Sequence, residues 1–546
     1  MSNEEKQTYN DVYKKWKWNI PEYYNFAFDV VDKWAEADKT KLALVSILKD
    51  GESAKFDTFY ELMVQSNKVA NLLLELGFKK GDKVLFISDS VPEWYYCMLG
   101  MFKLGIVPMP GTALLTTTDI EYRLNRSEAV GVITNSNHTE SVDEAVKKCT
   151  FVKHKILMDG SKSGWVDLVA KMKEMPISLD KDKIIKTKSS DPLMIYFTSG
   201  TTGHPKMVLH SHAYPLGHEV TARFCQDLKP TDLHWTVSDP GWAKCAWGKF
   251  FGQMIVGAAI IQWDNPGRFD SDGLLGLMER YGVTTFCAPP TVYRMLIQTD
   301  LSKFKLKLRH CLAAGEPLNP EVIRVWKDNF NLDIYDFFGQ TETVALLSNF
   351  TFLPLKFGSV GLPTPGHDVR VINDDLQESP PNEEGQIALY LDKSKPKPPG
   401  LMKEYWKDPD IMASAFQGDY YLTGDKAYRD EDGYFWFVGR DDDVIKSSGY
   451  RIGPFEVESV LIEHPAVAES AVVGVDDPDG IRGVLVKAFI VLAKGYKPSE
   501  ELTKEIQDFV KSRTAPYKYP RIIEYNDSLP KTISGKLLRR ELRKKG

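Results

Sequence analysis

The sequence predicts an α/β protein with a large N-terminal domain, built of parallel-rich sheets covered by helices, and a small α+β domain at the C-terminus. Three observations predict this class. Apolar runs of strand length alternate with amphipathic helical patterns over most of the chain. This alternation stops near residue 440, in a charged and Gly-rich stretch. The chain, at 546 residues, is also too long for one ordinary core.

The elements of the large domain follow from apolar spacing and from caps. Thr58 and Glu61 form a capping box, and apolar residues continue at helical spacing from there to Gly77. Asn319 is a good N-cap, with Pro320 at the first helical position. The other expected elements are strands at 84–88, 193–197, 283–288, 309–314 and 332–337, and helices at 274–281, 291–298 and 320–330.

Ligands of open parallel sheets bind at the loops beyond the carboxyl ends of the strands. Three polar loops are expected at these ends, namely Thr198–Lys206, Gly315–Pro317 and Gly339–Thr343. The sequence therefore predicts that these three segments share one site.

The pattern changes towards the C-terminus. A turn at Asp432-Gly433 precedes a strand at 434–439, and the following GRDDDVIKSSGYRIG has no periodicity, which predicts a linker or a functional loop. Beyond it we expect a helix at 455–463, strands at 467–475 and 485–492, and a helix after the cap at Ser499. We place the boundary at Arg440–Asp442, which divides the chain into domains 1–440 and 441–546.

Composition excludes several classes of protein. Hydrophobic residues make up 43% and charged residues 26%, and the net charge of −6 offers no basic field for nucleic acid. The longest apolar run, Met254–Ile261, is too short to insert across a membrane. The six cysteines form no CxxC pair, so we expect neither a zinc site nor a disulfide framework. The polar N-terminus does not resemble a signal peptide, and we expect a cytoplasmic protein.

The segment Tyr196–Lys206, YFTSGTTGHPK, carries the strongest chemical pattern. Four hydroxyl side chains and two glycines follow an apolar strand, and a lysine closes the segment. Glycines let backbone N–H groups approach an anion, and hydroxyls and a lysine add donors, as a polyphosphate requires. It is not a Walker A loop, because GK[ST] and a helix do not follow. A solvated Ser/Thr/Gly linker is the structural alternative for this loop taken alone.

Further motifs follow the loop, and together they resemble the adenylate-forming (acyl-AMP) superfamily of acyl-CoA synthetases, peptide-synthetase adenylation domains and luciferases. The motifs after the loop are AAGEP (Ala313–Pro317), YDFFGQTET (Tyr335–Thr343), YLTGD (Tyr421–Asp425), GRDDDVIKSSGYRI (Gly439–Ile452) and PKTISGK (Pro530–Lys536). The resemblance covers essentially the whole chain. RLNRSEA and APYKYPR (Ala515–Arg521) make the medium-chain acyl-CoA synthetases (AMP-forming) the most similar branch.

This resemblance implies a two-step reaction with ATP, CoA and Mg²⁺. The carboxylate of an acid attacks the α-phosphate of ATP and pyrophosphate leaves; the CoA thiol then attacks the acyl-adenylate and AMP leaves. Like charges meet in the first step, so neutralisation and positioning should dominate catalysis. The implied ATP-binding residues are Thr198, Ser199, Gly200, Thr201, Thr202, Gly203, His204, Pro205, Lys206, Gly315, Glu316, Pro317, Asp336, Phe337, Phe338, Gly339, Gln340, Thr341, Asp425, Arg440, Arg451 and Lys536.

The resemblance also implies catalytic, metal, hinge and CoA roles. The implied catalytic residues are Lys536, Thr341, Glu342, Lys206, Gly449 and Arg451, with Glu342 as the Mg²⁺ ligand. Lys536 would serve adenylation alone, after which the small, mobile domain would rotate about Asp442 and Gly449 would line the pantetheine tunnel. The implied CoA-binding residues are Arg123, Ser448, Gly449, Tyr450, Arg482, Lys511, Tyr519 and Arg521.

The acid is predicted from five residues of the expected acyl pocket, namely Trp242, Lys244, Trp247, Gly315 and Gly339. Acetyl-CoA synthetases carry a tryptophan before QTET, where this chain has Gly339, so the floor should be open and acetate should be a poor substrate. On one helix Lys244, Trp247 and Phe251 would share a face, and Trp247 would shorten the tunnel. We expect a short-to-medium, branched or compact acid. The alternative for these aromatics is an ordinary core.

Several alternatives stay open at this point. Lys244 departs from the apolar residue expected there, so an aromatic acid such as benzoate is a second hypothesis, and loading of a separate carrier protein is a third. A non-catalytic nucleotide sensor is a hypothesis of another class. His210 and His212 suggest a metal site but have no acidic or cysteine partner nearby, which favours a structural role. A small-molecule acid, ATP and CoA are the expected partners, and a homodimer is compatible with the sequence.

Overall fold

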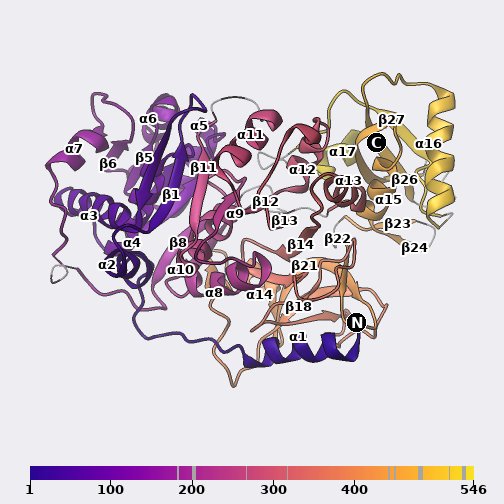
Figure 1. Cartoon of the computed structure of the whole chain (residues 1–546), viewed down its shortest axis with the longest axis horizontal. Coiled ribbons are helices and arrows are strands. Elements are labelled where there is room, and N and C mark those ends of the chain that lie inside the picture. Colours follow the sequence, from indigo (N-terminus) through magenta and orange to yellow (C-terminus); the bar gives the residue numbers. More distant parts are fainter. Residues whose placement is uncertain are drawn as a thin grey trace.

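The computed structural model describes residues 1–546 except 181, 183, 199–204, 266, 268, 316–317, 441–442, 448–449, 478–483, 516, 532–536 and 546. It confirms the predicted α/β class. In Figure 1, sheets flanked by helices occupy most of the molecule, and the segments after β22 (Phe435–Arg440) form a smaller unit at one end.

The first sheet is fully parallel, as the alternating pattern predicts. Its strands, in spatial order, are β4 (Val107–Gly111), β3 (Lys83–Ile87), β5 (Gly131–Thr134), β6 (His154–Leu157) and β7 (Val166–Asp167). The helices around it are α3 (Phe59–Glu75), α4 (Pro92–Leu104), α5 (Thr117–Ser127), α6 (Thr139–Val146) and α7 (Leu168–Glu174). The predicted capping box opens α3, where Glu61 N donates to Thr58 Oγ1 at 3.2 Å.

The second sheet carries two of the three loops expected to bind the nucleotide, those after β13 and β14. Its nine strands, in spatial order, are β16 (Leu362–Pro363), β15 (Ala345–Ser348), β14 (Ile334–Gly339), β13 (His310–Ala314), β12 (Thr285–Ala288), β10 (Leu233–Thr236), β11 (Ala259–Trp263), β1 (Leu42–Ile47) and β2 (Ala54–Thr58). The run from β14 to β1 is parallel, and the outer strands are antiparallel. The connecting helices are α11 (Ser271–Tyr281), α12 (Pro290–Leu296) and α13 (Pro320–Phe330).

The strands that flank the predicted phosphate loop belong to a third, antiparallel sheet, which corrects the expectation that they join a parallel one. β8 (Pro192–Thr198) and β9 (Lys206–Ser211) pair antiparallel, and β19 (Glu404–Tyr405) adds to the free side of β9. The physical reason is the connection: the segment between the two strands is too short for the crossover helix that parallel strands require.

Four short helical segments come after the β8–β9 hairpin in the sequence. They are α8 (Tyr214–Val220), which runs into η4 (Thr221–Cys225), and α9 (Ala243–Lys249), which is followed by α10 (Phe251–Val256). The single helix expected across 244–251 is wrong, because Phe250 has φ −148° and ψ −83° and ends α9. Lys244 and Phe251 therefore do not share a helical face.

A further antiparallel sheet lies near the N-terminal helix (Figure 1). Its strands are β17 (Asp368–Ile372), β18 (Gly385–Tyr390), β21 (Tyr420–Arg429), β20 (Phe416–Gln417) and β22, with α14 (Pro409–Ala415) beside it. Helix α1 (Asn3–Lys15) is fastened through Tyr9, whose hydroxyl donates to Pro363 O, and Tyr13, whose hydroxyl donates to His367 O, both at 2.8 Å. These two hydrogen bonds hold α1 against the segment 363–367. The chain then continues into α2 (Lys33–Ala37).

The C-terminal unit is α+β, as predicted. It contains the sheet β25 (Val467–Asp476), β26 (Val484–Leu492) and β27 (Ile522–Tyr525), and the helices α15 (Pro454–Ile462), α16 (Glu500–Arg513) and α17 (Arg539–Lys545). The stretch expected as a loop contains the hairpin β23 (Ile445–Ser447) and β24 (Tyr450–Ile452). Ile445 pairs with Ile452, and both side chains are buried. They pack in one cluster with residues of β25 and β26, and the short aperiodic segment does not reveal these distant contacts. The boundary at Arg440–Asp442 stays a prediction.

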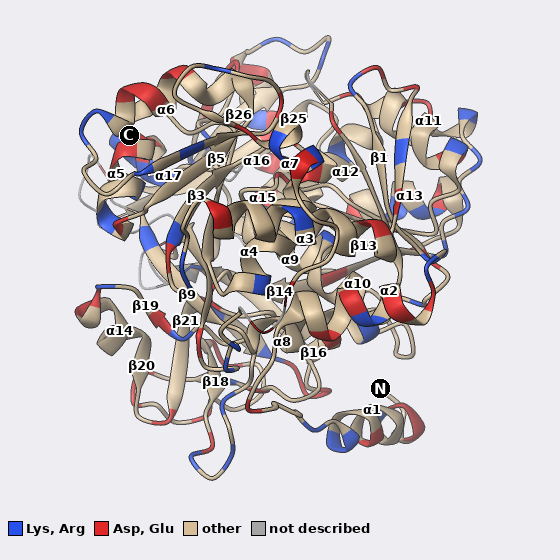
Figure 2. Cartoon of the chain, turned by 90° about the vertical axis from the view of Figure 1, so that its left-hand side faces the viewer, with Lys and Arg blue, Asp and Glu red and all other residues tan. Residues whose placement is uncertain are grey.

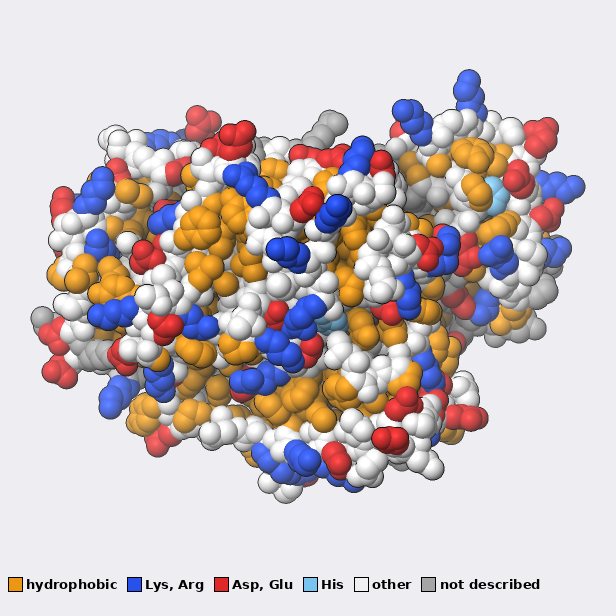
Figure 3. All heavy atoms as spheres, viewed as in Figure 1, with side chains coloured by type: hydrophobic (Ala, Val, Ile, Leu, Met, Phe, Trp, Pro, Cys, Tyr) orange, Lys and Arg blue, Asp and Glu red, His pale blue; other side chains and the backbone are white. Residues whose placement is uncertain are grey.

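The sides of the molecule seen in Figures 2 and 3 carry both signs of charge among the described residues. Lys/Arg and Asp/Glu residues alternate over the elements seen in Figure 2 and over the face in Figure 3. None of the helices formed by the described residues combines the length and the apolar character that a membrane span requires.

Candidate active site

Polar segments from three sheets meet beside the β8–β9 hairpin. His210 Nε2 on β9 lies 2.8 Å from Thr341 O, in the loop after β14. On its other side this loop reaches β21, where Gln340 Nε2 donates to Asp425 Oδ2 at 2.5 Å. The hairpin, the Gln340–Thr343 loop and β21 therefore form one site, as the sequence predicts for the first two segments.

Lys206 and Glu342 both lie beside one tyrosine, Tyr405. The Lys206 Nζ lies 5.2 Å from the ring centroid of Tyr405, and the Tyr405 hydroxyl donates to Glu342 Oε1 at 2.8 Å. Burial and the Glu342 carboxylate raise the pKa of Tyr405, so the phenol stays protonated and donates. A cation and a carboxylate held this way can face a polyphosphate and its metal ion together.

The Asp425 carboxylate is almost fully buried and its orientation is set by neighbours. Gln340 Nε2 also donates to Thr423 O at 2.8 Å, and the Tyr421 hydroxyl donates to Gln340 Oε1 at 2.9 Å. In the β21–β22 ladder Arg440 stands opposite Asp425. A fixed carboxylate beside an arginine suits a pair of ribose hydroxyls.

The carboxyl ends of β13 and β14 border the expected adenine position. Gly315 has φ +99° and a Cβ there would meet no atom within 4 Å, so this turn leaves open space. Lys244 is accommodated here, because its Nζ donates to Ala314 O at 2.8 Å and the side chain is half-buried. Asp336, in register with Ala313, is buried, and this burial raises its pKa to about 8.

We predict that Asp336→Asn makes the stability of the fold less dependent on pH. The folded pKa of about 8 lies above the ordinary aspartate pKa of 3.8, so the folded state holds a proton that the unfolded state loses, and wild-type stability falls as pH rises from about 4 to about 8. The free energy of unfolding of the variant relative to wild type should rise across this window by up to about 5 kcal/mol. Urea unfolding at pH 4 and pH 8 measures it; Asp374→Asn, at an exposed aspartate, is the control. Equal pH slopes for variant and wild type would refute the effect.

The expected acyl wall lies on α9. Trp247 is buried and packs edge-on against Phe337 of β14, with centroids 5.2 Å apart, while Trp242 is half-buried at the helix start. Trp247 Nε1 has no hydrogen-bond partner among the described residues. Phe251 instead packs against Phe26 with ring centroids 4.8 Å apart, so the core alternative holds for Phe251.

Gly339 has a backbone role besides the one expected from the sequence. A Cβ at Gly339 would lie 2.4 Å from Val344 O, at the bulge between β14 and β15. A larger residue there therefore requires the main chain to move. The open floor of the pocket stays a prediction.

The two histidines after the hairpin are buried. Burial lowers the pKa of His210 and of His212 to about 3, so both are neutral. No group of three or more His, Cys, Asp or Glu residues suited to a metal ion occurs in the described part of the chain.

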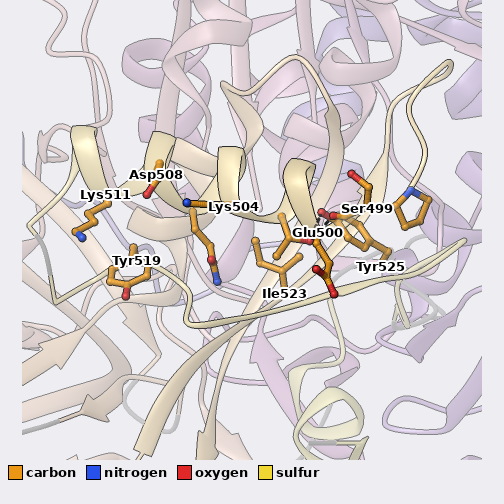
Figure 4. Close-up of a pocket in the computed structure, with 11 residues that line it drawn as sticks. Ser499, Glu500, Lys504, Asp508, Lys511, Tyr519, Ile523 and Tyr525 are labelled. Atoms are coloured by element: carbon orange, nitrogen blue, oxygen red, sulfur yellow. Dashed lines mark hydrogen bonds between the residues drawn. The ribbon is translucent and has the colours of Figure 1, made fainter.

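The expected CoA residues fall in two places. Arg123 on α5 is nearly buried and its guanidinium lies 4.9 Å from the centroid of the Phe197 ring, next to Thr198. On the small unit, Lys511 and Tyr519 line an open groove of ≈ 800 Å³ between α16 and β27 (Figure 4). Arg521 Nη1 donates to the Tyr519 hydroxyl at 2.9 Å, so two cations flank one aromatic ring.

Some predicted residues lie outside the described part of the chain, namely Ser199, Gly200, Thr201, Thr202, Gly203, His204, Glu316, Pro317, Asp442, Ser448, Gly449, Arg482 and Lys536. Tyr450 and Arg451 are placed in β24 by their backbone pairing.

Sequence reasoning missed Tyr405 and Tyr421. Tyr405 comes from β19, about 60 residues beyond Glu342, in a stretch without any motif. Tyr421 opens the YLTGD motif, where only Asp425 was assigned a role. Only the pairing of β19 with β9 brings Tyr405 to the site.

Comparisons with known proteins show the family of the chain. The AMP-binding enzyme family matches residues 31–406, and the AMP-binding enzyme C-terminal domain matches residues 456–536. The mitochondrial acyl-coenzyme A synthetase ACSM3 of Homo sapiens is 45% identical over 98% of this chain and 92% of its own. The 4-hydroxybutyrate–CoA ligase 1 of Metallosphaera sedula is 45% identical over 96% and 90% of the two chains.

Solved structures show the same architecture. The anthranilate CoA ligase AuaEII, in complex with anthranoyl-AMP, superposes with a TM-score of 0.88 at 30% identity, covering 96% of this chain and 98% of its own. A Brucella canis acyl-CoA synthetase superposes at 0.76 and 33% identity, covering 98% of each chain. Adenylate-forming acyl-CoA synthetases use ATP and CoA. The chain belongs to the AMP-binding enzyme family and is an acid–thiol ligase, an AMP-forming acyl-CoA synthetase.

Proposed function

We propose that this synthetase activates a short-to-medium carboxylic acid, with Mg²⁺ as the metal of the ATP. The observation that carries the proposal is the meeting of Lys206, Thr341, Glu342 and Asp425 at one site. In this arrangement Lys206 and the hydroxyl-rich loop hold the β- and γ-phosphates, and Asp425 accepts the ribose hydroxyls. Glu342 binds Mg²⁺ through its carboxylate, since Mg²⁺ prefers one or two carboxylates together with phosphate oxygens.

The remaining roles follow the order of the two steps. Lys536 bridges the carboxylate and the α-phosphate in the first step, and the small domain then rotates about Asp442. Gly449 leaves room for pantetheine in the second step, while Lys511, Tyr519 and Arg521 meet the nucleotide end of CoA. A pair of cations around an aromatic ring supports that last assignment, because phosphates and an adenine ring need both contacts.

The size of the acid depends on Trp247. This side chain stands between α9 and β14 and would stop a long alkyl chain. An aromatic acid is the second candidate, supported by the structural likeness to the AuaEII ligase and to a benzoate CoA ligase of Burkholderia xenovorans LB400, the latter with a TM-score of 0.83 at 28% identity. Loading of a carrier protein is a third, which the two cations around the Tyr519 ring disfavour.

A panel of acids tests the proposed substrate class together with the proposed role of Trp247 in limiting chain length. CoA-dependent AMP release should be highest with straight or branched C4–C6 acids and low with acetate, octanoate and benzoate. Trp247→Leu should improve octanoate relative to butyrate about 10-fold, because space for extra methylenes is worth about 1–3 kcal/mol. Phe250→Leu, in the aromatic core beside α9, is the matched control and should leave the ratio unchanged. A benzoate optimum would support the second candidate, and pyrophosphate exchange without CoA-dependent AMP release the third.

A further inference from the structure

A set of buried side chains beside the active site has polar atoms without partners. The polar-aromatic cluster, as we name it, consists of Tyr196 on β8, His210 on β9, Tyr214 and His218 on α8, and Thr221 at the start of η4. All five residues are at most 1% exposed. Among the described residues no partner exists for Tyr196 Oη, His210 Nδ1, Tyr214 Oη, His218 Nδ1, His218 Nε2 and Thr221 Oγ1.

The cluster is continuous. The rings of His210 and Tyr214 stack with centroids 3.7 Å apart, and Tyr214 meets His218 edge-on at 4.5 Å. Tyr196 stands edge-on to His210 at 6.4 Å. Thr221 follows His218 by three residues, a spacing that places both on one side of a helix.

The cluster also adjoins the reacting groups. His210 contacts Thr341 O at 2.8 Å through its other nitrogen, and Thr341 precedes the proposed metal ligand Glu342. The Glu342 carboxylate contributes to the raised pKa of Tyr214, after burial, which places the two groups within electrostatic reach. The cluster therefore borders the Gln340–Thr343 loop of the site.

Folding alone does not explain so many unpaired groups. Each buried donor or acceptor left unpaired costs roughly 1–3 kcal/mol, and native structures contain few of them. Six such atoms in one continuous set favour an occupant that hydrogen-bonds to them.

The chemistry of the cluster restricts this occupant. Burial lowers the pKa of His218 and of His210 and raises that of Tyr196 and of Tyr214, so all four side chains are neutral. Neutral phenols, a hydroxyl and imidazoles both donate and accept hydrogen bonds. A neutral hydroxyl satisfies such a set, whereas a second carboxylate would be buried without a cation among these five residues.

We infer that the polar-aromatic cluster binds a hydroxyl group on the acyl chain, so that the preferred acid of this synthetase is a short hydroxy acid rather than its alkyl counterpart. The inference rests on the proposed function, because it names the substrate class of the same site.

The test compares alkyl and hydroxy acids of equal length. The values of kcat/KM for CoA-dependent AMP release are measured with butyrate and with 3- and 4-hydroxybutyrate, and likewise with the five-carbon series. In the wild type at least one hydroxy acid should exceed its alkyl counterpart by about 10-fold or more, since a site that hydrogen-bonds a substrate hydroxyl discriminates against analogues without it. Tyr214→Phe and Thr221→Val should each reduce this preference several-fold.

A matched control removes a buried hydroxyl that is already paired. The Tyr293 hydroxyl donates to Leu312 O at 3.0 Å, away from the cluster, and Tyr293→Phe should leave the preference unchanged. If the cluster variants do not fold, the wild-type preference decides alone. Equal or better activity with the alkyl acids would overturn the inference and leave the ligase assignment intact, with water as the partner of these atoms. AMP release with none of the panel acids would overturn the proposed acid class as well.

Discussion

Lys536→Ala should abolish adenylation and spare thioester formation. The variant should form acyl-adenylate from ATP and acid about 10²–10³-fold more slowly than wild type, because one preorganised cation beside a developing charge contributes about this much. When acyl-adenylate is supplied directly, transfer to CoA should proceed within a few-fold of the wild-type rate, since Lys536 serves only the first step in our proposal. Pyrophosphate release and AMP release from supplied acyl-adenylate measure the two steps separately.

The same segment offers a matched control. Lys531 is exposed and forms a surface ion pair with Glu469 at 2.7 Å, so Lys531→Ala removes an equal charge near Lys536 at a cost of no more than about 1 kcal/mol of stability. Both steps should remain near wild type in this control. Equal loss of both steps in Lys536→Ala would disprove the proposal that Lys536 serves adenylation only.

Glu342→Gln should lower kcat/KM for adenylation about 10²–10³-fold and raise the Mg²⁺ concentration needed for half-maximal rate. Gln keeps an acceptor for the Tyr405 hydroxyl, which donates to Glu342 Oε1 at 2.8 Å, so the local packing is retained while the charge is lost. Initial rates of pyrophosphate release over a Mg²⁺ titration measure the effect.

Tyr405→Phe distinguishes the effect of the Glu342 charge from the effect of the hydrogen bond that holds Glu342. It removes the hydroxyl that holds Glu342 and leaves the carboxylate, so the rate should fall modestly while the Mg²⁺ requirement stays close to wild type. If Glu342→Gln and Tyr405→Phe shift the Mg²⁺ requirement equally, the carboxylate only positions the loop and the metal role is wrong.

The family motifs and many local elements were predictable because they are encoded in short contiguous segments. The capping box at Thr58, the Asn319 cap and the alternation of strands with helices depend on local spacing, and the structure confirms them. The link of the Gln340–Thr343 loop to the hairpin also agrees with the prediction, because both segments carry their donors and acceptors within a few residues.

Other features depend on contacts between distant residues and were wrong or missing. The hairpin of β8 and β9 was assigned to a parallel sheet, and α9 was extended through Phe250, because apolar runs do not reveal strand direction or a helix break. Tyr405 reaches Glu342 only through the pairing of β19 with β9.

The sequence by itself determined the family of this protein, since the motifs of the AMP-binding enzymes are particular side chains in a particular local order. The tertiary structure alone decided which buried polar side chains are left without partners among the described residues. Tyr196, Tyr214, His218 and Thr221 are unremarkable in the sequence, and their meaning comes from burial without partners. Hydrogen-bond satisfaction is a property of the packed three-dimensional surroundings, and no local pattern carries it.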